Sequence, residues 1–340
     1  MLRKNPGKKK RGSQKPRALV LFSGGLDSIL TIRLLQKAGI SVEAINFATP
    51  FSAGQSYVNR IAKKFRVRVH KVKVDSAYFS MIRKPRHGYG ANMNPCLDCK
   101  IYMFRRAAAF AKKRKFDFLA TGEVLGERPF SQIRPLMFLI EKEAGLDGKI
   151  VRPLSGALLP PTEAEKKGLI KRKDLLAISG RNRTPQLQLA KKFRIKEFPS
   201  PGGGCLLTDP GFSHKVRDFL KYSKTLSWDD VELLRLGRHF RFGKEKIIVG
   251  RRHEENLELK RLARKQGLGW MEVQKFMGPV TIVQGKSKAL LQKAAGLTVR
   301  YSDTPEDWCV KLAFRKGKTK KVLESAAMQE QEIEKLRVSH

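Results

Sequence analysis

The sequence is poor in acidic residues. In 340 residues, 31 Asp and Glu stand against 71 Lys and Arg, which leaves a formal net charge of +40. Self-repulsion on this scale disfavours a compact chain unless a polyanion supplies the opposite charge. The composition therefore favours nucleic acid as the partner over an anionic membrane, and over a basic surface with no single partner.

Long apolar runs and disulfide-forming cysteines are also missing. No stretch approaches the ~18 consecutive apolar residues of a transmembrane helix, and the 4 cysteines are too few for a disulfide framework in a chain of this length. Residues 1–17 are basic and rich in Gly and Pro but lack an apolar centre, so we expect a flexible arm rather than a secretion signal. Together these absences predict a cytoplasmic protein without a membrane partner.

Within a predicted domain at residues 18–208, short apolar runs and helical patterns alternate through residue 125, and segments punctuated by Pro and Gly follow after about residue 140. The first helical pattern places Ile29, Ile32 and Leu35 on one face, directly after an apolar run and a glycine turn. A second helix is predicted over residues 102–113. The expected strands are residues 18–22, 42–47, 67–74 and 116–121. This order predicts an α/β fold with a doubly wound parallel sheet.

The pattern changes near residue 209 to a smaller α+β domain, which we place at 209–315, followed by a charged tail over 316–340. A hairpin is predicted from residues 239–242 and 247–250, with further strands at 271–276, 280–283 and 297–301. Aromatic and basic residues interleave in this hairpin, which suits stacking on RNA bases, although the same alternation places Phe240 and Phe242 together in a core. Arg251 and Arg252 follow the hairpin and are predicted RNA contacts.

A glycine-rich segment, Ser23-Gly24-Gly25-Leu26-Asp27-Ser28, lies directly between a predicted strand and a predicted helix. Glycines there let the backbone approach an anion, the helix start directs N–H groups at it, and the Ser23 and Ser28 hydroxyls add donors. Asp27 repels phosphate, so its expected role is to hold Mg²⁺ on a pyrophosphate. The alternative is an ordinary turn with Asp27 as a helix cap.

Three of the cysteines form a second pattern. Cys96 and Cys99 precede the predicted helix at 102–113, and Cys205 follows three glycines. A Cys-X-X-Cys at a helix start favours thiolate, because the helix dipole and Lys100 stabilise the negative charge. Three chemistries are open: a redox pair, a structural zinc that lacks an evident fourth ligand, or an iron-sulfur cluster on three thiolates. Cys309 is expected to be an inert buried thiol.

The glycine-rich segment resembles the signature of the PP-loop ATP pyrophosphatases, which cleave ATP between the α- and β-phosphates and pass AMP to a substrate oxygen. With the cysteines, the chain resembles the tRNA thiolases of this superfamily, which make 2-thiouridine, 4-thiouridine and 2-thiocytidine. Thr121 and Gly122 are similar to the family segment beside the α-phosphate, and Glu123 stands where many relatives have His. This resemblance covers residues 18–209.

The resemblance implies an ATP site, a magnesium site on Asp27 and a thiolation reaction. The implied ATP-binding residues are Ser23, Gly24, Gly25, Asp27, Ser28, Phe47, Thr121 and Gly122. A base carbonyl of tRNA, most simply that of uridine, would attack the α-phosphate, and sulfur would then replace its oxygen. Sulfur would arrive from a Cys205 persulfide, with Cys99 or Cys96 resolving the disulfide, or from sulfide on a 4Fe-4S cluster held by all three. A sulfurtransferase protein or free sulfide would act as the sulfur donor.

Two further stretches carry resemblances. Gly180-Arg181-Asn182-Arg183 looks like a basic substrate-contacting stretch, so Arg181 and Arg183 are expected to clamp a phosphate of ATP or RNA. The segment at 240–256 is similar to the RNA-binding NFACT-R module. Two other functions stay open: a PP-loop ligase or amidase acting on a small molecule, and a non-catalytic RNA-binding factor. The net charge disfavours the first, and the cysteines with Asp27 disfavour the second.

Overall fold

A computed structural model describes residues 15–52, 55–199 and 204–338 of the chain. They form two compact units. Unit 1 comprises Met1–Gly90 and Pro95–Gly204, and unit 2 comprises Ala91–Asn94 and Cys205–His340. Most of the expected basic arm lies outside the described residues, and Arg17 at its end already belongs to the first strand. The longer stretch of unit 2 starts at Cys205, and the domain bounds expected from the sequence stay a prediction.

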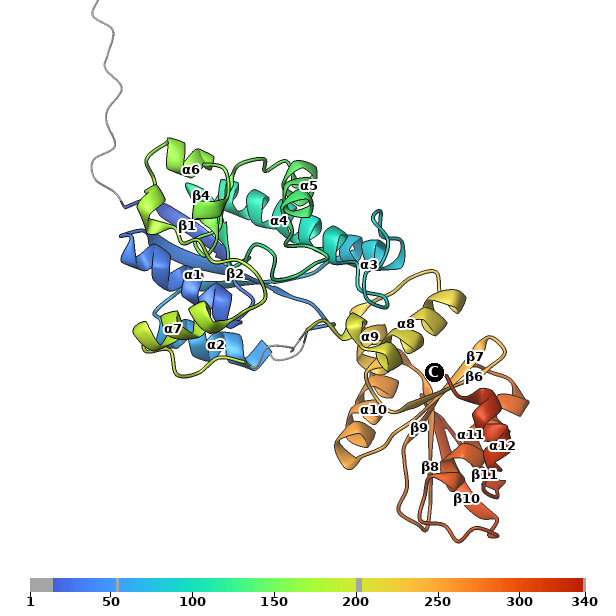
Figure 1. The fold of residues 1–340 in the computed structure, drawn as a ribbon. Helices are drawn as coiled ribbons and strands as arrows, with labels where there is room; N and C mark the ends of the chain where they lie inside the picture. The colour runs from blue at the N-terminus through green and yellow to red at the C-terminus, as the bar shows by residue number, and fades with distance from the viewer. Residues whose placement is uncertain (1–14, 53–54, 200–203, 339–340) are drawn as a thin grey trace, which may run out of the picture. The chain divides into compact units, whose positions relative to one another are not determined.

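Unit 1 is built on a parallel sheet with the strand order β3-β2-β1-β4-β5 (Figure 1). The strands are β1 (Arg17–Leu21), β2 (Ser41–Ala48), β3 (Val69–Lys73), β4 (Phe118–Thr121) and β5 (Ile150–Val151). The predicted doubly wound α/β fold is therefore confirmed. Strand order reverses between β1 and β4, and the loops that leave the carboxyl ends of strands at such a reversal are where ligands bind in open α/β sheets.

Helices cover both faces of this sheet. One core cluster joins alternate residues of β1 to α1 (Leu26–Lys37), α2 (Gln55–Lys64) and α7 (Thr184–Lys192). The other joins Leu19 to α4 (Cys96–Lys113) and α5 (Arg134–Ala144). The remaining helices are α3 (Ser76–Arg83) and α6 (Glu163–Lys166). Helix α4 begins earlier than the expected residue 102, so both Cys96 and Cys99 lie inside it.

Unit 2 contains an antiparallel sheet with the order β11-β10-β8-β9-β7-β6. Its strands are β6 (Arg238–Phe242), β7 (Glu245–Val249), β8 (Gly269–Val273), β9 (Thr281–Gln284), β10 (Val310–Lys316) and β11 (Thr319–Ser325). Its helices are α8 (Pro210–Tyr222), α9 (Trp228–Leu234), α10 (His253–Gln266), α11 (Lys288–Arg300) and α12 (Glu330–Leu336). The predicted hairpin is the β6–β7 pair.

Two expectations for unit 2 were wrong. The strand expected at 297–301 lies mainly in α11, because Ser287 caps this helix and Leu290, Ala294 and Leu297 are buried at helical spacing. The charged tail expected at 316–340 contains β11, which pairs with β10, and α12, whose Ile333 is fully buried. Charged side chains on the exposed positions of these two elements hide their packing pattern in the sequence.

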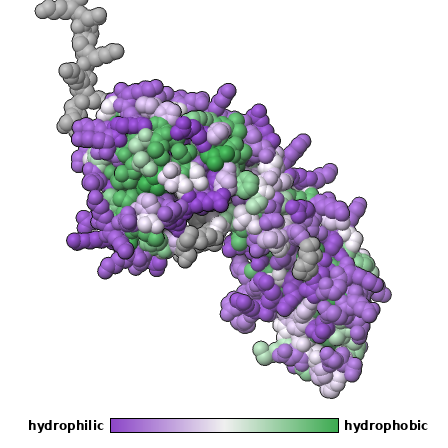
Figure 2. All heavy atoms as spheres, in the orientation of Figure 1, coloured by the Kyte–Doolittle hydropathy of each residue, from purple (hydrophilic) through white to green (hydrophobic). Residues whose placement is uncertain are grey.

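In the view of Figure 2, hydrophilic side chains cover most of unit 2 and the rim of unit 1, and hydrophobic residues are visible in the middle of unit 1. Among the described helices, none combines the length and the apolarity that crossing a bilayer requires.

Candidate nucleotide and thiol sites

The segment between β1 and α1 forms a loop at the carboxyl end of β1. Gly24 has a φ of 85°, a left-handed conformation that favours glycine. Gly25 is the N-cap residue of α1. Because glycine has no side chain, the N-cap residue accepts no hydrogen bond from the N–H groups of the first turn. The Ser28 hydroxyl donates to the Gly25 carbonyl at 2.8 Å, and the Gly25 N–H donates to the Ser23 hydroxyl at 3.2 Å. The start of α1 is therefore preorganised to bind an anion.

We call residues 23–28, between β1 and α1, the phosphate loop after its predicted role. The loop that follows β4 packs directly on it. A Cβ placed on Gly122 would lie 2.6 Å from both the carbonyl carbon of Asp27 and the nitrogen of Ser28, so only glycine fits. Thr121 is 2% exposed, and its carbonyl accepts a hydrogen bond from the Thr31 hydroxyl of α1 at 3.5 Å. The structure thus brings Thr121 and Gly122 to the phosphate loop, while their contact with a nucleotide stays a prediction.

Asp27 lies in a partly buried cluster of charged and polar groups. Burial raises the pKa of its carboxyl, although the guanidinium groups of Arg183 and Arg128 and the amide of Gln186 oppose that rise. Burial, together with the nearby Asp27 charge, also raises the pKa of Glu127. One Asp27 carboxylate oxygen is buried without a hydrogen bond from any described residue. An unpartnered carboxylate oxygen is the ligand type that Mg²⁺ prefers, so the site fits the predicted metal.

The sequence analysis did not identify Glu127, Arg128 and Gln186 as members of this cluster. Glu127 and Arg128 follow Gly122 in the loop after β4, so their position near the end of this strand indicates in the sequence that they can reach the site. Gln186 lies about 60 residues further along the chain, and no sequence pattern indicates that it belongs to the site. Of the predicted residues, Arg183 joins the cluster, and Arg181 is exposed. The ring of Phe47 packs in a core cluster with Leu19 and is 9% exposed.

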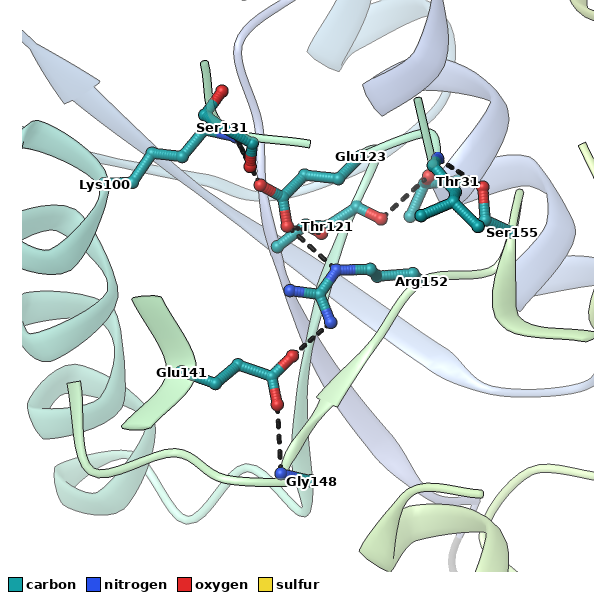
Figure 3. Close-up of polar contacts among 10 residues, drawn as sticks. Thr31, Lys100, Thr121, Glu123, Ser131, Glu141, Gly148, Arg152 and Ser155 are labelled. Atoms are coloured by element: carbon teal, nitrogen blue, oxygen red, sulfur yellow. Dashed lines mark hydrogen bonds and ion pairs between the residues drawn. The ribbon is translucent and has the colours of Figure 1, made fainter. Parts of the chain in front are cut away.

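Glu123 is the centre of a buried ionic network (Figure 3). Its carboxylate pairs with the Lys100 ammonium at 2.5 Å and with the Arg152 guanidinium at 2.9 Å, and Arg152 also pairs with Glu141. Burial raises the pKa of Glu123, but the charges of Lys100 and Arg152 outweigh it and lower the pKa to about 2. Glu123 also accepts a hydrogen bond from the Thr121 hydroxyl at 3.2 Å. It therefore ties α4, β4 and the segment after β5 together.

This network corrects one expectation about the thiols. Lys100 was expected to stabilise a thiolate, but its ammonium forms an ion pair with Glu123 instead. Cys96 and Cys99 lie in the first turn of α4 and are half-buried. The Tyr78 hydroxyl lies 3.7 Å from the Cys99 sulfur. Lys100 is therefore held by Glu123 rather than by the two thiols at the start of α4.

The other two cysteines belong to unit 2. Cys205 is half-buried and precedes the short turn Leu206–Thr208. Cys309, which we expected to be buried, is exposed, and its neighbour Trp308 is 57% exposed. Among the residues that the structure describes, no three His, Cys, Asp or Glu side chains are placed to hold a metal ion. The three-thiolate cluster therefore stays a prediction.

The two predicted RNA contacts in unit 2, Arg251 and Arg252, have different surroundings. Arg251 forms an ion pair with Glu255 at 2.6 Å, whereas Arg252 is exposed at the start of α10. Phe240 is fully buried, so packing explains this residue. Arg238 lies over the Tyr301 ring at 4.5 Å.

Comparisons with known proteins match the two parts of the chain separately. Residues 12–158 match the family model of the thiamine biosynthesis protein (ThiI), and residues 237–337 match that of the NFACT protein RNA binding domain. The probable tRNA sulfurtransferase of Ureaplasma urealyticum is 32% identical over 116 residues, which are 33% of this chain and 30% of the relative. That of Mycoplasma genitalium is 28% identical over 145 residues, or 41% of this chain and 36% of the relative. The chain thus spans about a third of the length of these curated relatives.

Similar solved structures include a 4-thiouridine synthetase in complex with RNA and ATP, at 20% identity and a TM-score of 0.35, covering 53% of this chain and 52% of that one. The C-terminal part of the fibronectin/fibrinogen-binding protein from Streptococcus suis matches at 14% identity and a TM-score of 0.27, covering 70% of this chain and 97% of that one. Scores of this size add nothing to the family matches. On those matches, the chain is similar to the ThiI family over residues 12–158 and to the NFACT-type RNA-binding domain over residues 237–337.

Proposed function

We propose that the chain is an ATP-dependent tRNA sulfurtransferase, which adenylates a uridine carbonyl and replaces its oxygen with sulfur. The observation that carries this proposal is a combination within one chain. Unit 1 holds an uncapped phosphate loop and a thiol pair in the first turn of α4, and unit 2 carries an RNA-binding domain. A nucleotide site and nucleophilic sulfur are what thiolation of an RNA base requires.

The first step is adenylation. The carbonyl oxygen of the base attacks the α-phosphorus, the bond to the β-phosphate breaks, and pyrophosphate leaves. Charge develops on the phosphate oxygens, where the N–H groups at the start of α1 can stabilise it. Mg²⁺ held by Asp27 would neutralise the departing pyrophosphate. Arg128 and Arg183 add positive charge beside Asp27, so the cluster suits a polyanionic substrate.

The second step brings sulfur to the activated base. In the persulfide route, the terminal sulfur on Cys205 attacks the base carbon, and AMP leaves with the former carbonyl oxygen. The Cys99 or Cys96 thiolate then takes the Cys205 sulfur as a disulfide and releases the thiolated base. An external thiol reduces that disulfide, and a sulfur donor restores the persulfide. In the cluster route, Cys96, Cys99 and Cys205 would hold an iron-sulfur centre, which would supply sulfide in place of the persulfide.

The test supplies the purified chain with tRNA, ATP, Mg²⁺ and a thiol reductant, with either sulfide or a persulfide-carrying sulfur donor in parallel reactions. It measures nucleosides by mass spectrometry and pyrophosphate by a coupled assay. We expect a thiouridine and pyrophosphate release that requires tRNA. Pyrophosphate release without tRNA would point to a small-molecule ligase. Tight tRNA binding without either product would point to a non-catalytic RNA-binding factor.

Iron content separates the two sulfur routes. Stoichiometric iron after anaerobic reconstitution, lost in a Cys96→Ser variant, would support the cluster. Reconstituted protein without iron that still thiolates tRNA would support the persulfide.

A further inference from the structure

Helix α7 lies between the two stretches of sequence that the family models match. It packs against α1, the helix that begins at the phosphate loop. The strand-like stretch before it is fixed beside the loop that follows β4. The Gly180 N–H donates to the Leu125 carbonyl at 2.7 Å, and the Ser155 hydroxyl donates to the Ile178 carbonyl at 2.6 Å. These contacts hold the stretch before α7 beside the loop that follows β4, and that loop in turn packs on the phosphate loop.

The buried side of α7 is polar where packing alone would make it apolar. Gln186 is 0% exposed, whereas the adjacent Leu187 is 43% exposed. A helix selected only for packing would bury the leucine and expose the glutamine. Ala190, one helical turn after Gln186, is 2% exposed, so this face is the one that packs on unit 1. Burial of Gln186 therefore requires a reason other than core formation.

Neither amide atom of Gln186 has a partner at full hydrogen-bonding distance and angle among the described residues, although the amide lies near enough to the Asp27 carboxyl to lower its pKa. The Arg183 Nε and one oxygen of Asp27 share this condition. An unsatisfied buried polar group costs about 1–3 kcal/mol, so folded proteins leave few of them. Arg183 and Gln186 both lie close enough to Asp27 to act on its carboxyl group. Three side chains with unmet hydrogen-bonding capacity in one place indicate that a polar ligand completes the site.

We propose that Gln186 and Arg183 complete the nucleotide site as positioning residues, with the Gln186 amide orienting the Asp27 carboxylate and the Arg183 guanidinium facing the pyrophosphate part of ATP. This inference rests on the proposed function for the identity of the ligand. It assigns a role in ATP recognition to α7, which neither family match includes.

The test measures binding of a non-hydrolysable ATP analogue with Mg²⁺ to the full chain without RNA, by equilibrium dialysis. We expect Gln186→Leu to weaken binding about tenfold, because an amide that orients Asp27 is lost. The matched control is Gln188→Leu, since Gln188 is exposed on the same helix, and it should bind like the wild type. Wild-type affinity in Gln186→Leu would overturn the inference. A wild-type chain that binds no nucleotide would instead contradict the proposed function.

A second variant covers the case in which Gln186→Leu fails to fold, as judged by circular dichroism. Gln186→Glu keeps the side-chain size but adds a negative charge beside Asp27, so nucleotide binding should weaken at low Mg²⁺ and recover as Mg²⁺ is raised. Binding that matches the wild type at every Mg²⁺ concentration would overturn the inference.

The role of Arg183 is tested by comparing the binding of the ATP analogue with the binding of AMP. Arg183→Ala should weaken binding of the ATP analogue about tenfold and leave AMP binding unchanged, because AMP lacks the pyrophosphate that the guanidinium faces. Lys191→Ala, an exposed cation on the same helix, is the control. Equal weakening for the ATP analogue and AMP would contradict this assignment.

Discussion

Gly122 and Asp27 touch through their backbones: a Cβ on Gly122 would lie 2.6 Å from the carbonyl carbon of Asp27. The loop after β4 and the phosphate loop after β1 therefore pack as one surface. The two strands are neighbours in the sheet, with Leu21 opposite Thr121, so both loops leave the same edge. This contact explains why glycine follows Thr121, independently of any nucleotide.

We expect Gly122→Ala to displace the phosphate loop. The added methyl group meets backbone atoms that have no flexible side chain to move, and overpacking of this kind costs about 1–3 kcal/mol. Affinity for an ATP analogue should fall at least about tenfold, measured by equilibrium dialysis. In the control Gly211→Ala, the nearest atom lies at 3.5 Å, and nucleotide binding should not change. Unchanged affinity in Gly122→Ala would show that the phosphate loop tolerates displacement.

Glu123→Gln should destabilise unit 1 in a pH-dependent way. The pKa of Glu123 is lowered from 4.5 to about 2, so its ionised form stabilises the fold above about pH 4.5, and this contribution is lost as the pH falls toward 2. At neutral pH the variant should lose about 3 kcal/mol of unfolding free energy, since Arg152 and Lys100 lose a buried counter-charge. The difference from the wild type should shrink as the pH is lowered, as followed by denaturant unfolding.

A control for this prediction is Glu163→Gln, which removes an exposed ion pair with Lys167. Exposed pairs contribute about 0–1 kcal/mol, so little change is expected. A loss in Glu123→Gln that stays constant from neutral pH to acid would contradict the assignment of the effect to the Glu123 charge.

Replacing Cys99 by Ser should separate adenylation from sulfur transfer. The phosphate loop does not contain Cys99, so tRNA-dependent pyrophosphate release should persist while thiouridine formation falls below detection. Cys309→Ser should retain both activities, since this exposed cysteine has no part in the proposed reaction. Thiouridine formation by Cys99→Ser at the wild-type rate would remove Cys99 from the sulfur step.

The two arginines after the β6–β7 hairpin should differ in their contribution to RNA binding. Arg252→Ala should weaken binding and reduce the slope of log affinity against log salt by about 1, as expected for loss of one phosphate contact. Arg251→Ala should have a smaller effect, because Glu255 already neutralises its charge. Affinity titrations of tRNA at several salt concentrations measure both slopes. A larger change for Arg251→Ala would reverse this assignment.

Local patterns were enough to predict much of the fold. The strand, glycine turn and helix around Asp27, and the β6–β7 hairpin, involve residues close in sequence, and their periodicity appears directly in the chain. The start of α4 at Cys96 was harder to predict, because the buried residue of its first turn is Asp98, which accepts hydrogen bonds from the backbone N–H groups of Arg86 and His87. The packing of α12 was harder to predict because charged residues on its exposed face mask the apolar spacing. The strand expected at 297–301 failed for a related reason: a run of buried residues is compatible with either a strand or a buried helix.

The sequence by itself predicted a glycine-rich loop after the first strand, a thiol pair close to the start of a helix, and a polyanionic partner. Only the tertiary structure decided which groups these features meet. The Lys100 ammonium pairs with Glu123 rather than with the thiols. Gln186, which is far from Asp27 along the chain, lies near its carboxyl group, and Cys205 belongs to unit 2. These partners are distant along the chain, so their separation depends on how the helices pack on the sheet. A local sequence pattern contains no information on that packing.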